Sequence, residues 1–214
     1  VGAGKTVTLV ETKGGADVGN YNITDQGTTT ANITPKAITV TAADKTKTYG
    51  DANPALTYSI TSGALVGSDS LTGAITTAAT TTSNVGDYDI TQGTLTNANN
   101  TNYAITYVDG TLTITQKALT ITANDQSKTY GDTLTFVGNE FTTSTMVGSE
   151  SVASATFTVA SSADSTTTAN VGTYAITPSA ASGASGTNLN NYSITYVDGT
   201  LTVNQKALTI TADA

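Results

Sequence analysis

Alternating apolar and hydroxyl-bearing residues predict short β-strands along much of the chain. In residues 36–42 (KAITVTA) Ile38 and Val40 alternate with threonines, and residues 117–123 (KALTITA) repeat the pattern. A period of two places the apolar side chains on one face of a strand and the threonines on the other. Threonine is β-branched and suits an extended backbone. We therefore expect a mainly-β chain whose sheets carry threonine on their outer faces.

Helical periodicity is weak throughout the sequence. No segment of about 10–12 residues keeps an apolar stripe at the spacing of 3.6 residues that a helix requires. The best candidates for a single helical turn are residues 65–70 and 146–151. The pattern leaves open whether either stretch is helical.

Two Asp-Gly pairs predict β-hairpins. Asp109-Gly110 and Asp198-Gly199 each lie between alternating segments, and Asp-Gly suits a two-residue type I′ turn. Such a turn would place apolar residues of its two strands opposite each other on one face. The expected facing pairs are Tyr107 with Leu112, Ile105 with Ile114, Tyr196 with Leu201, and Ile194 with Val203.

Long stretches of the sequence recur at a nearly fixed spacing. KAITVTAADKTKTYGD begins at Lys36 and KALTITANDQSKTYGD at Lys117, 81 residues later. NYAITYVDGTLTITQK from Asn102 returns as NYSITYVDGTLTVNQK from Asn191, 89 residues later. Such self-similarity is typical of tandem repeats. The anchors divide the chain into the C-terminal part of a preceding repeat (1–35), repeat 1 (36–116), repeat 2 (117–205) and the first strand of a following repeat (206–214), as expected for an excerpt of a longer array.

These anchors resemble a known family. KTYGD, NVG-x-Y, NY-x-ITYVDGTLT and QKALTITA look like the tandem mirror beta-grasp repeats, called MBG or YDG domains, of large bacterial surface adhesins. Residues 1–35, with GGADVGNYNIT, are similar to the end of the related YDG-type repeat. The resemblance implies small β-sheet domains, export from a bacterium and a place in a long adhesin. It carries no catalytic residue or ligand pocket onto this chain.

The junction between repeats has no spacer. The segment TLTIT runs through Gln116 directly into KALTITA, without the Gly, Pro or Ser residues of a flexible linker. At the earlier junction Pro35 stiffens the chain. We expect consecutive domains to share nearly continuous strands and to form an elongated rod.

Composition excludes several classes of function. The 214 residues include 49 threonines and carry a net charge of -8, with no Cys, His or Arg. The strongest ligands for zinc, haem and iron–sulfur clusters are therefore missing, as are nucleophile–histidine catalytic pairs. Eight lysines against sixteen acidic residues argue against nucleic-acid binding. No apolar run approaches the roughly 18 residues of a membrane helix, so we expect no membrane insertion.

Four aspartates near the repeat boundaries are the only metal candidates that we single out. They could supply oxygen ligands to Ca²⁺, which takes six to eight. Their spacing matches no calcium-binding loop, however, and aspartate beside Tyr-Gly also suits a turn cap. We favour the turn and predict no cofactor, with Ca²⁺ as the alternative. The candidates are Asp44, Asp51, Asp125 and Asp132.

One pair of carboxylates has the spacing of a catalytic pair. Asp87 and Asp89 would share a strand face, and glycoside hydrolysis uses two carboxylates. Repeat 2 has Thr173 and Ala175 at these positions, so the fold is retained without them. We predict that the protein is not an enzyme.

The recurring lysines and tyrosines can each be interpreted structurally or functionally. The lysines that open the repeats could form isopeptide crosslinks, but a charge at a strand start also discourages edge pairing. The recurring tyrosines could stack on sugars, although strand parity places most of them in the core. We favour the structural reading for both sets, which are Lys36, Lys117 and Lys206, and Tyr88, Tyr103, Tyr107, Tyr174, Tyr192 and Tyr196.

We therefore expect a structural stalk segment of an extracellular bacterial adhesin, at the cell surface or in a secreted filament. It would hold a distal binding region away from the cell and bear tension, with the neighbouring repeats as its partners. The alternative is that the repeats themselves bind an exopolysaccharide or host glycan, or associate with other copies of the fibre.

Overall fold

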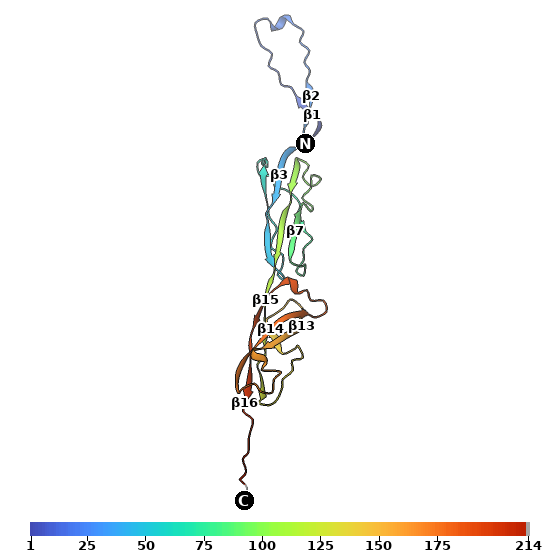
Figure 1. Cartoon of the computed structure of the whole chain (residues 1–214). Helices are drawn as coiled ribbons and strands as arrows, with labels where there is room; N and C mark the ends of the chain where they lie inside the picture. The colour runs from blue at the N-terminus through green and yellow to red at the C-terminus, as the bar shows by residue number, and fades with distance from the viewer. Residues whose placement is uncertain (213–214) are drawn as a thin grey trace. The chain divides into compact units, whose positions relative to one another are not determined.

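The structure, a computed structural model, describes residues 1–212 and consists of short strands joined by turns and loops (Figure 1). The chain forms two compact units that do not coincide with the repeats. The first contains residues 1–45, 55–78 and 88–112. The second contains residues 46–54, 79–87 and 113–214, so three segments of repeat 1 (46–54, 79–87 and 113–116) belong to the unit built on repeat 2.

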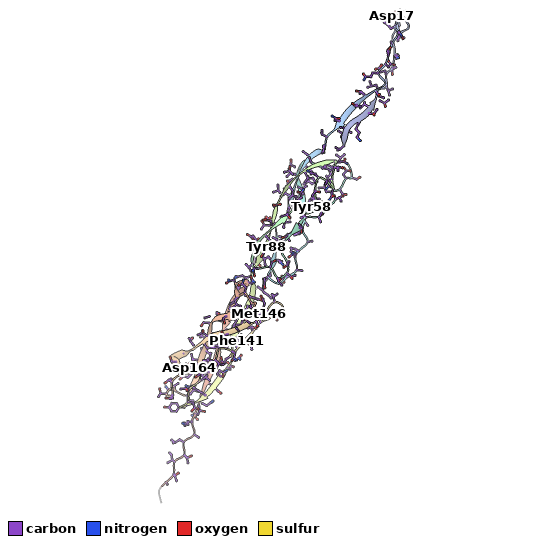
Figure 2. The ribbon with its side chains drawn as sticks, turned by 90° about the vertical axis from the view of Figure 1, so that its right-hand side faces the viewer. Asp17, Tyr58, Tyr88, Phe141, Met146 and Asp164 are labelled. Carbon is purple, nitrogen blue, oxygen red and sulfur yellow. The ribbon has the colours of Figure 1, made fainter. Side chains whose placement is uncertain are left out.

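The N-terminal residues form a two-stranded antiparallel hairpin. Strand β1 (Gly2–Thr8) pairs with β2 (Thr28–Ile33), and a short 3-10 helix, η1 (Val18–Asn20), lies in the loop between them. Asp17 marks the far end of this loop (Figure 2), and Lys13 forms an ion pair of 2.5 Å with Asp25 in it. Every residue of β2 is exposed. The hairpin thus has no core of its own, which makes an isolated two-stranded ribbon marginally stable.

Repeat 1 contributes a three-stranded and a four-stranded sheet. The order of the first is β5 (Tyr58–Ser62), β3 (Lys36–Ala42), β8 (Tyr103–Val108). The order of the second is β4 (Lys45–Thr48), β9 (Gly110–Thr115), β7 (Gly86–Thr91), β6 (Thr76–Thr77).

Repeat 2 has the same strand order. Its three-stranded sheet is β12 (Phe141–Thr143), β10 (Lys117–Ala123), β15 (Tyr192–Val197). Its four-stranded sheet is β11 (Gln126–Thr129), β16 (Gly199–Asn204), β14 (Gly172–Gly183), β13 (Val152–Val159). Single turns of 3-10 helix, η2 (Ala160–Ser162) and η3 (Leu189–Asn191), follow β13 and precede β15.

The predicted hairpins are wrong. Strands β8 and β9 belong to different sheets, as do β15 and β16, so the residues expected to face each other across an Asp-Gly turn are not paired. Neither Gly110 nor Gly199 has a positive φ, whereas a type I′ turn requires one at both central residues. A Cβ on Gly199 would lie 2.5 Å from the carbonyl oxygen of Ala123. Glycine is needed here because two backbones approach closely where the chain changes sheet.

Two long segments of repeat 2 instead run side by side in parallel. Lys117 pairs with Tyr192 at one end and Thr129 with Asn204 at the other, so the register offset stays at 75 residues from β10 and β15 into β11 and β16. Both segments therefore pass together from the three-stranded sheet into the four-stranded one. In repeat 1, β3 and β8 also pair in parallel, with Lys36 opposite Tyr103.

The alternation predicted for the first strand of each repeat is confirmed. Along β10 Leu119, Ile121 and Ala123 are buried, and the threonines between them are half-buried. Strand β10 contacts β14 and β16 of the other sheet. The core of the second unit thus lies between its two sheets, and its fully enclosed side chains include Ile176 and Leu201. In the first unit the corresponding core contains Ile38, Val40, Leu95, Tyr103 and Ile105.

The two candidate helical turns are hydrogen-bonded reverse turns. The amide of Asp69 donates to the carbonyl of Val66, and that of Glu150 donates to Val147, each at 3.0 Å. Neither stretch is helical. Only Gln116 separates β9 from β10, as the sequence predicts.

Residues 206–212 have the sequence of β10 but form no strand. Leu208 and Ile210, whose counterparts are core residues of β10, are 85% and 88% exposed. A strand needs pairing partners, and β10 obtains them from β12 and β15. The strand predicted over residues 206–214 stays a prediction, and its last two residues lie outside the described part of the chain.

Candidate functional site

The four aspartates predicted as calcium candidates have two different structural roles. Oδ1 of Asp44 accepts a 2.8 Å hydrogen bond from the amide of Thr111, and Oδ1 of Asp125 accepts the same bond from Thr200. Each carboxylate therefore binds the backbone directly after the glycine at which the chain changes sheet. Within residues 1–212 no three carboxylates lie close enough to hold a metal ion together.

The other two candidates lie in turns beside buried lysines, which the sequence analysis missed. The amides of Asp51 and Asp132 close turns onto Thr48 and Thr129 at 3.0 Å. Lys47 and Lys128 are each only 7% exposed. A buried ammonium group needs hydrogen-bond acceptors to offset its desolvation, and the KTYGD segment brings it to main-chain carbonyls.

These lysines bind loops within the second unit. Nζ of Lys47 donates to the carbonyls of Thr80, at 2.6 Å, and Asp51, at 3.0 Å. Nζ of Lys128 donates to Thr166 at 2.6 Å. Burial lowers the pKa of Lys47, and the negative charge of Asp51 opposes that shift.

The carboxylate pair of β7 lies on an exposed strand face. Asp87 and Asp89 are both exposed, and Oδ1 of Asp87 accepts a 2.7 Å hydrogen bond from the hydroxyl of Thr113 on β9. The lysines that open the repeats lie at strand starts, where β3 begins at Lys36 and β10 at Lys117. The aspartates thus lie on a solvated strand surface and the lysines at strand starts, in agreement with the structural interpretation of both sets.

Burial of the recurring tyrosines follows strand parity, with one exception. Tyr103 and Tyr192 are buried, while Tyr88, Tyr107 and Tyr174 are half-buried. Tyr196 is 36% exposed, and its hydroxyl accepts a hydrogen bond from the amide of Ala181. The core reading is therefore wrong for Tyr196, whose side chain is exposed and whose hydroxyl binds the backbone of β14.

Glu150 of the second unit binds two tyrosine hydroxyls at once. Its Oε1 accepts a 2.9 Å hydrogen bond from the hydroxyl of Tyr49, and its Oε2 accepts one from the hydroxyl of Tyr192. The two tyrosine rings lie edge to face, with centroids 5.6 Å apart. The Tyr192 hydroxyl in turn accepts a bond of 2.9 Å from the amide of Val147. One carboxylate thus joins a tyrosine of each repeat.

Burial and the carboxylate both affect these phenols. Burial, followed by the hydrogen bond to Glu150, raises the pKa of Tyr192 to about 12. The same two causes raise the pKa of Tyr49. A phenol bound to a carboxylate must keep its proton to donate, so both tyrosines are held neutral.

A second contact of this site is built from asparagines. Asn191 is 1% exposed; its Oδ1 accepts a 3.0 Å hydrogen bond from the amide of Val85, and its Nδ2 donates to Oδ1 of Asn84 at 2.9 Å. Nearby, Nε2 of Gln116 donates to the carbonyl of Asn190 at 3.1 Å. All these residues belong to the second compact unit. Asn191 therefore holds the NVG segment of repeat 1 against repeat 2.

An open pocket of about 350 Å³ lies between these contacts, lined among others by Tyr49, Asn84 and Glu150. Next to Tyr49, Gly50 has a φ of +88°, and an added Cβ there would lie 2.4 Å from Cγ2 of Val147. Glycine at this position lets Val147 contact the backbone directly. We call this pocket and the residues around it the Glu150 site; here segments of the two repeats pack against each other within the second unit.

Repeat 1 contains an equivalent contact between a tyrosine hydroxyl and a carboxylate in the first unit. The Tyr103 hydroxyl donates to Oδ2 of Asp69 at 2.6 Å and accepts from the amide of Val66 at 2.8 Å. These residues correspond to Tyr192, Glu150 and Val147. The sequence signal was the recurring string Val-Gly-Ser followed by an acid, for which the sequence analysis considered only a possible helical turn.

None of the described helices is long and apolar enough to cross a membrane. A comparison with curated proteins finds no match to the chain. A comparison with protein families matches residues 38–113 and 119–202 to the MBG domain (YGX type). The two matched stretches follow one another in tandem, cover most of the chain, and contain the paired small sheets of the mirror beta-grasp fold. The chain belongs to the MBG domain family, of which it carries two tandem members.

Proposed function

We propose that the two MBG domains form a load-bearing spacer segment of an extracellular, adhesin-type protein of the bacterial surface. Family membership supports the adhesin-type setting. The observation that carries the mechanical role is the parallel pairing of the first and last segments of repeat 2, from Lys117–Tyr192 to Thr129–Asn204.

This pairing places the repeat in a shear geometry under tension. A force along the polypeptide pulls the N-terminal end of β10 one way and the C-terminal end of β16 the other way. Because the two segments are parallel, those points lie at opposite ends of the pairing. The interstrand hydrogen bonds along it are then loaded together and must break together, which slows forced unfolding.

The route of the chain through successive repeats supports the same proposal. Strand β9 leads through Gln116 alone into β10, so tension leaving repeat 1 enters the paired segment of repeat 2 without an extensible linker. The side chain of Gln116 is fixed to the carbonyl of Asn190, next to β15. The acidic, hydroxyl-rich surface would keep an array of such domains soluble.

Single-molecule pulling in two directions tests this function. The chain lacks cysteine, so Ala118→Cys with Asn204→Cys gives handles at opposite ends of the pairing. Ala118→Cys with Ser193→Cys gives handles on two exposed, directly paired residues at one end. We expect a several-fold higher unfolding force for the first pair of handles, because the second opens the bonds one at a time. Equal forces would reject the load-bearing role.

Pulling the chain by its termini adds a check on the unit that resists force. Release of about 90 residues lengthens a chain by about 30 nm at 3.3–3.6 Å per residue. We expect force peaks spaced by about that length, one for each repeat. A single gradual extension without peaks would contradict the proposal.

Glycan binding by the repeats is the alternative, and exposed aromatic rings are the observation that favours it. Tyr21, Tyr58 and Tyr130 are 71%, 37% and 41% exposed, and a ring face can stack on a sugar. A glycan array probed with the whole chain tests this role. Binding that is lost in Tyr58→Ala or Tyr130→Ala would support it, and absence of binding would exclude it for the glycans present.

A further inference from the structure

The far end of repeat 2 repeats the set of residues by which repeat 1 contacts the Glu150 site. Tyr130-Gly131 corresponds to Tyr49-Gly50, and Asn170-Val171 corresponds to Asn84-Val85. Residues 205–212 (QKALTITA) are identical to residues 116–123. In repeat 1, Tyr49 supplies a hydroxyl donor to repeat 2, Gly50 lets Val147 approach its backbone, and Val85 supplies a backbone amide.

The two sets differ in what covers them. Tyr49 is 4% exposed beneath Glu150 and Val147, whereas Tyr130 is 41% exposed. Val85 is half-buried with its amide bound to Asn191, whereas Val171 is 50% exposed. An open cavity of about 440 Å³ lies over Tyr130, Asn170, Val171 and the side of Lys206.

We propose that Tyr130, Gly131, Asn170 and Val171 form a docking surface for a further MBG domain joined after Gln205. The occupant is defined by its chemistry. It presents a carboxylate to the Tyr130 hydroxyl, an asparagine to the Val171 amide and a small apolar side chain to Gly131, as Glu150, Asn191 and Val147 do within the second unit.

Gly131 supports this assignment because no atom of repeat 2 lies close to the position of an added Cβ. A Cβ on Gly50 would strike Val147 at 2.4 Å, whereas a Cβ on Gly131 would meet only the flexible end of Lys206, at 3.3 Å. Gly131 keeps the positive φ of its counterpart, +95° against +88°. The Lys206 side chain lies where the apolar side chain of the docked domain belongs, and it moves aside when the chain continues as β10 does.

A contact of this kind is heterologous: each domain offers one face to the domain before it and a different face to the domain after it. Heterologous contacts that do not close into a ring propagate along an array. The inference concerns this contact at zero force and does not depend on whether the domains bear load. Pulling and docking experiments can therefore fail separately.

The test replaces residues 206–214 with a second copy of residues 117–214, which continues the sequence without a foreign junction. The added copy carries Tyr130→Phe and Val171→Ile, so that its peptides differ in mass from those of the first copy. Tyr130 of the first copy is then probed by nitration with tetranitromethane and peptide mass spectrometry, and its Val171 amide by hydrogen exchange. We expect nitration of that Tyr130 to fall at least several-fold, to the level of the buried Tyr49 in the same sample, and exchange at Val171 to slow by a similar factor. Unchanged reactivity of Tyr130 and unchanged exchange at Val171 would overturn the proposal.

Two substitutions in the added copy make the result specific. Glu150→Gln there removes one of the two carboxylate acceptors, and Asn191→Ala removes the acceptor of the Val171 amide; each should restore most of the Tyr130 nitration or the Val171 exchange. Asp164→Asn in the same copy removes a carboxylate outside the contact and should leave Tyr130 protected. Protection that survives both Glu150→Gln and Asn191→Ala would reject the assigned contacts. Protected Tyr49 in every sample shows that the preceding part of the chain is folded.

Discussion

The Tyr49 hydroxyl donates a 2.9 Å hydrogen bond to Oε1 of Glu150, 101 positions further along the chain. Tyr49 comes from the KTYGD segment of repeat 1, and Glu150 belongs to repeat 2, yet both lie in one compact unit. Tyr192 binds the second carboxylate oxygen. Because one acid serves a tyrosine from each repeat, the stability of the second unit should depend on residues of both.

Replacing Glu150 tests this dependence. We expect Glu150→Gln to lower the free energy of unfolding by about 1–3 kcal/mol, because hydrogen bonds to a charged acceptor are stronger than those to an amide. Urea denaturation followed by circular dichroism measures the change, and Glu11→Gln in the exposed N-terminal loop is the matched control. In a double-mutant cycle with Tyr49→Phe, additive effects would show that the two side chains are not coupled.

Alkaline conditions should weaken the second unit through Tyr192. Its pKa is raised from 10.0 to about 12 by burial and the hydrogen bond to Glu150, so the folded protein binds this proton more tightly than the unfolded chain does. The resulting stabilisation is fully present below pH 10 and is lost as the pH rises from 10 toward 12.

Lys47 acts in the opposite direction. Burial lowers its pKa from 10.5, so its destabilising charge is relieved as the pH rises toward 10.5, and it contributes no further change above that. Urea midpoints measured between pH 9 and 11.5 should therefore fall most steeply above pH 10.5. The fall should be smaller in Tyr192→Phe; an equal fall in that variant would assign the effect to other groups.

Alanine at Gly199 should be poorly tolerated. Its Cβ would lie 2.5 Å from the carbonyl oxygen of Ala123, whereas that of Gly110→Ala would lie 3.0 Å from the backbone of Ala42. We expect a loss of roughly 1–3 kcal/mol for Gly199→Ala, a smaller loss for Gly110→Ala, and almost none for Gly14→Ala, which meets no atom. Thermal unfolding of the three variants gives the order. Equal effects would mean that close backbone approach is not the reason for glycine.

Removing the Lys128 side chain should loosen the loop at residues 160–169. Its ammonium group donates to the Thr166 carbonyl at 2.6 Å. Alanine removes this hydrogen bond together with the buried methylene groups. Hydrogen exchange of the loop amides should accelerate in Lys128→Ala. The exposed Lys5→Ala is the control. Unchanged exchange in Lys128→Ala would show that other contacts hold the loop.

Calcium should not stabilise the protein. Asp44 and Asp125 bind the amides of Thr111 and Thr200, which leaves them as backbone caps. We expect the melting temperature to stay the same in millimolar Ca²⁺ and in excess chelator. An increase of several degrees with Ca²⁺ that Asp125→Asn abolishes would restore the calcium reading.

The alternation of residue types correctly predicted which side chains are buried, where burial depends only on the residue's own strand. The inward positions Ile38, Val40, Leu119 and Ile121 follow from alternation alone, because any sheet with one covered face selects the same parity. The direct passage through Gln116 also follows from sequence, since no residue there favours a linker.

Pairing partners could not be read in this way. An Asp-Gly pair between two alternating segments is the usual sign of a hairpin. At Gly110 and Gly199 it marks a change of sheet instead, and only the close approach of Ala42 and Ala123 reveals the reason. The Glu150 site was missed for a related cause: its members from the two repeats are separated by about a hundred residues, and no local pattern shows that they meet.

The sequence by itself determined that this protein is a tandem array of β domains with threonine-bearing strands, because period and repetition are one-dimensional properties. The tertiary structure decided which strands are neighbours. It paired the first and last segments of repeat 2 in parallel, and it brought Tyr49 and Tyr192 onto one carboxylate. Those outcomes depend on how sheets pack and where backbones can approach, which no local pattern encodes.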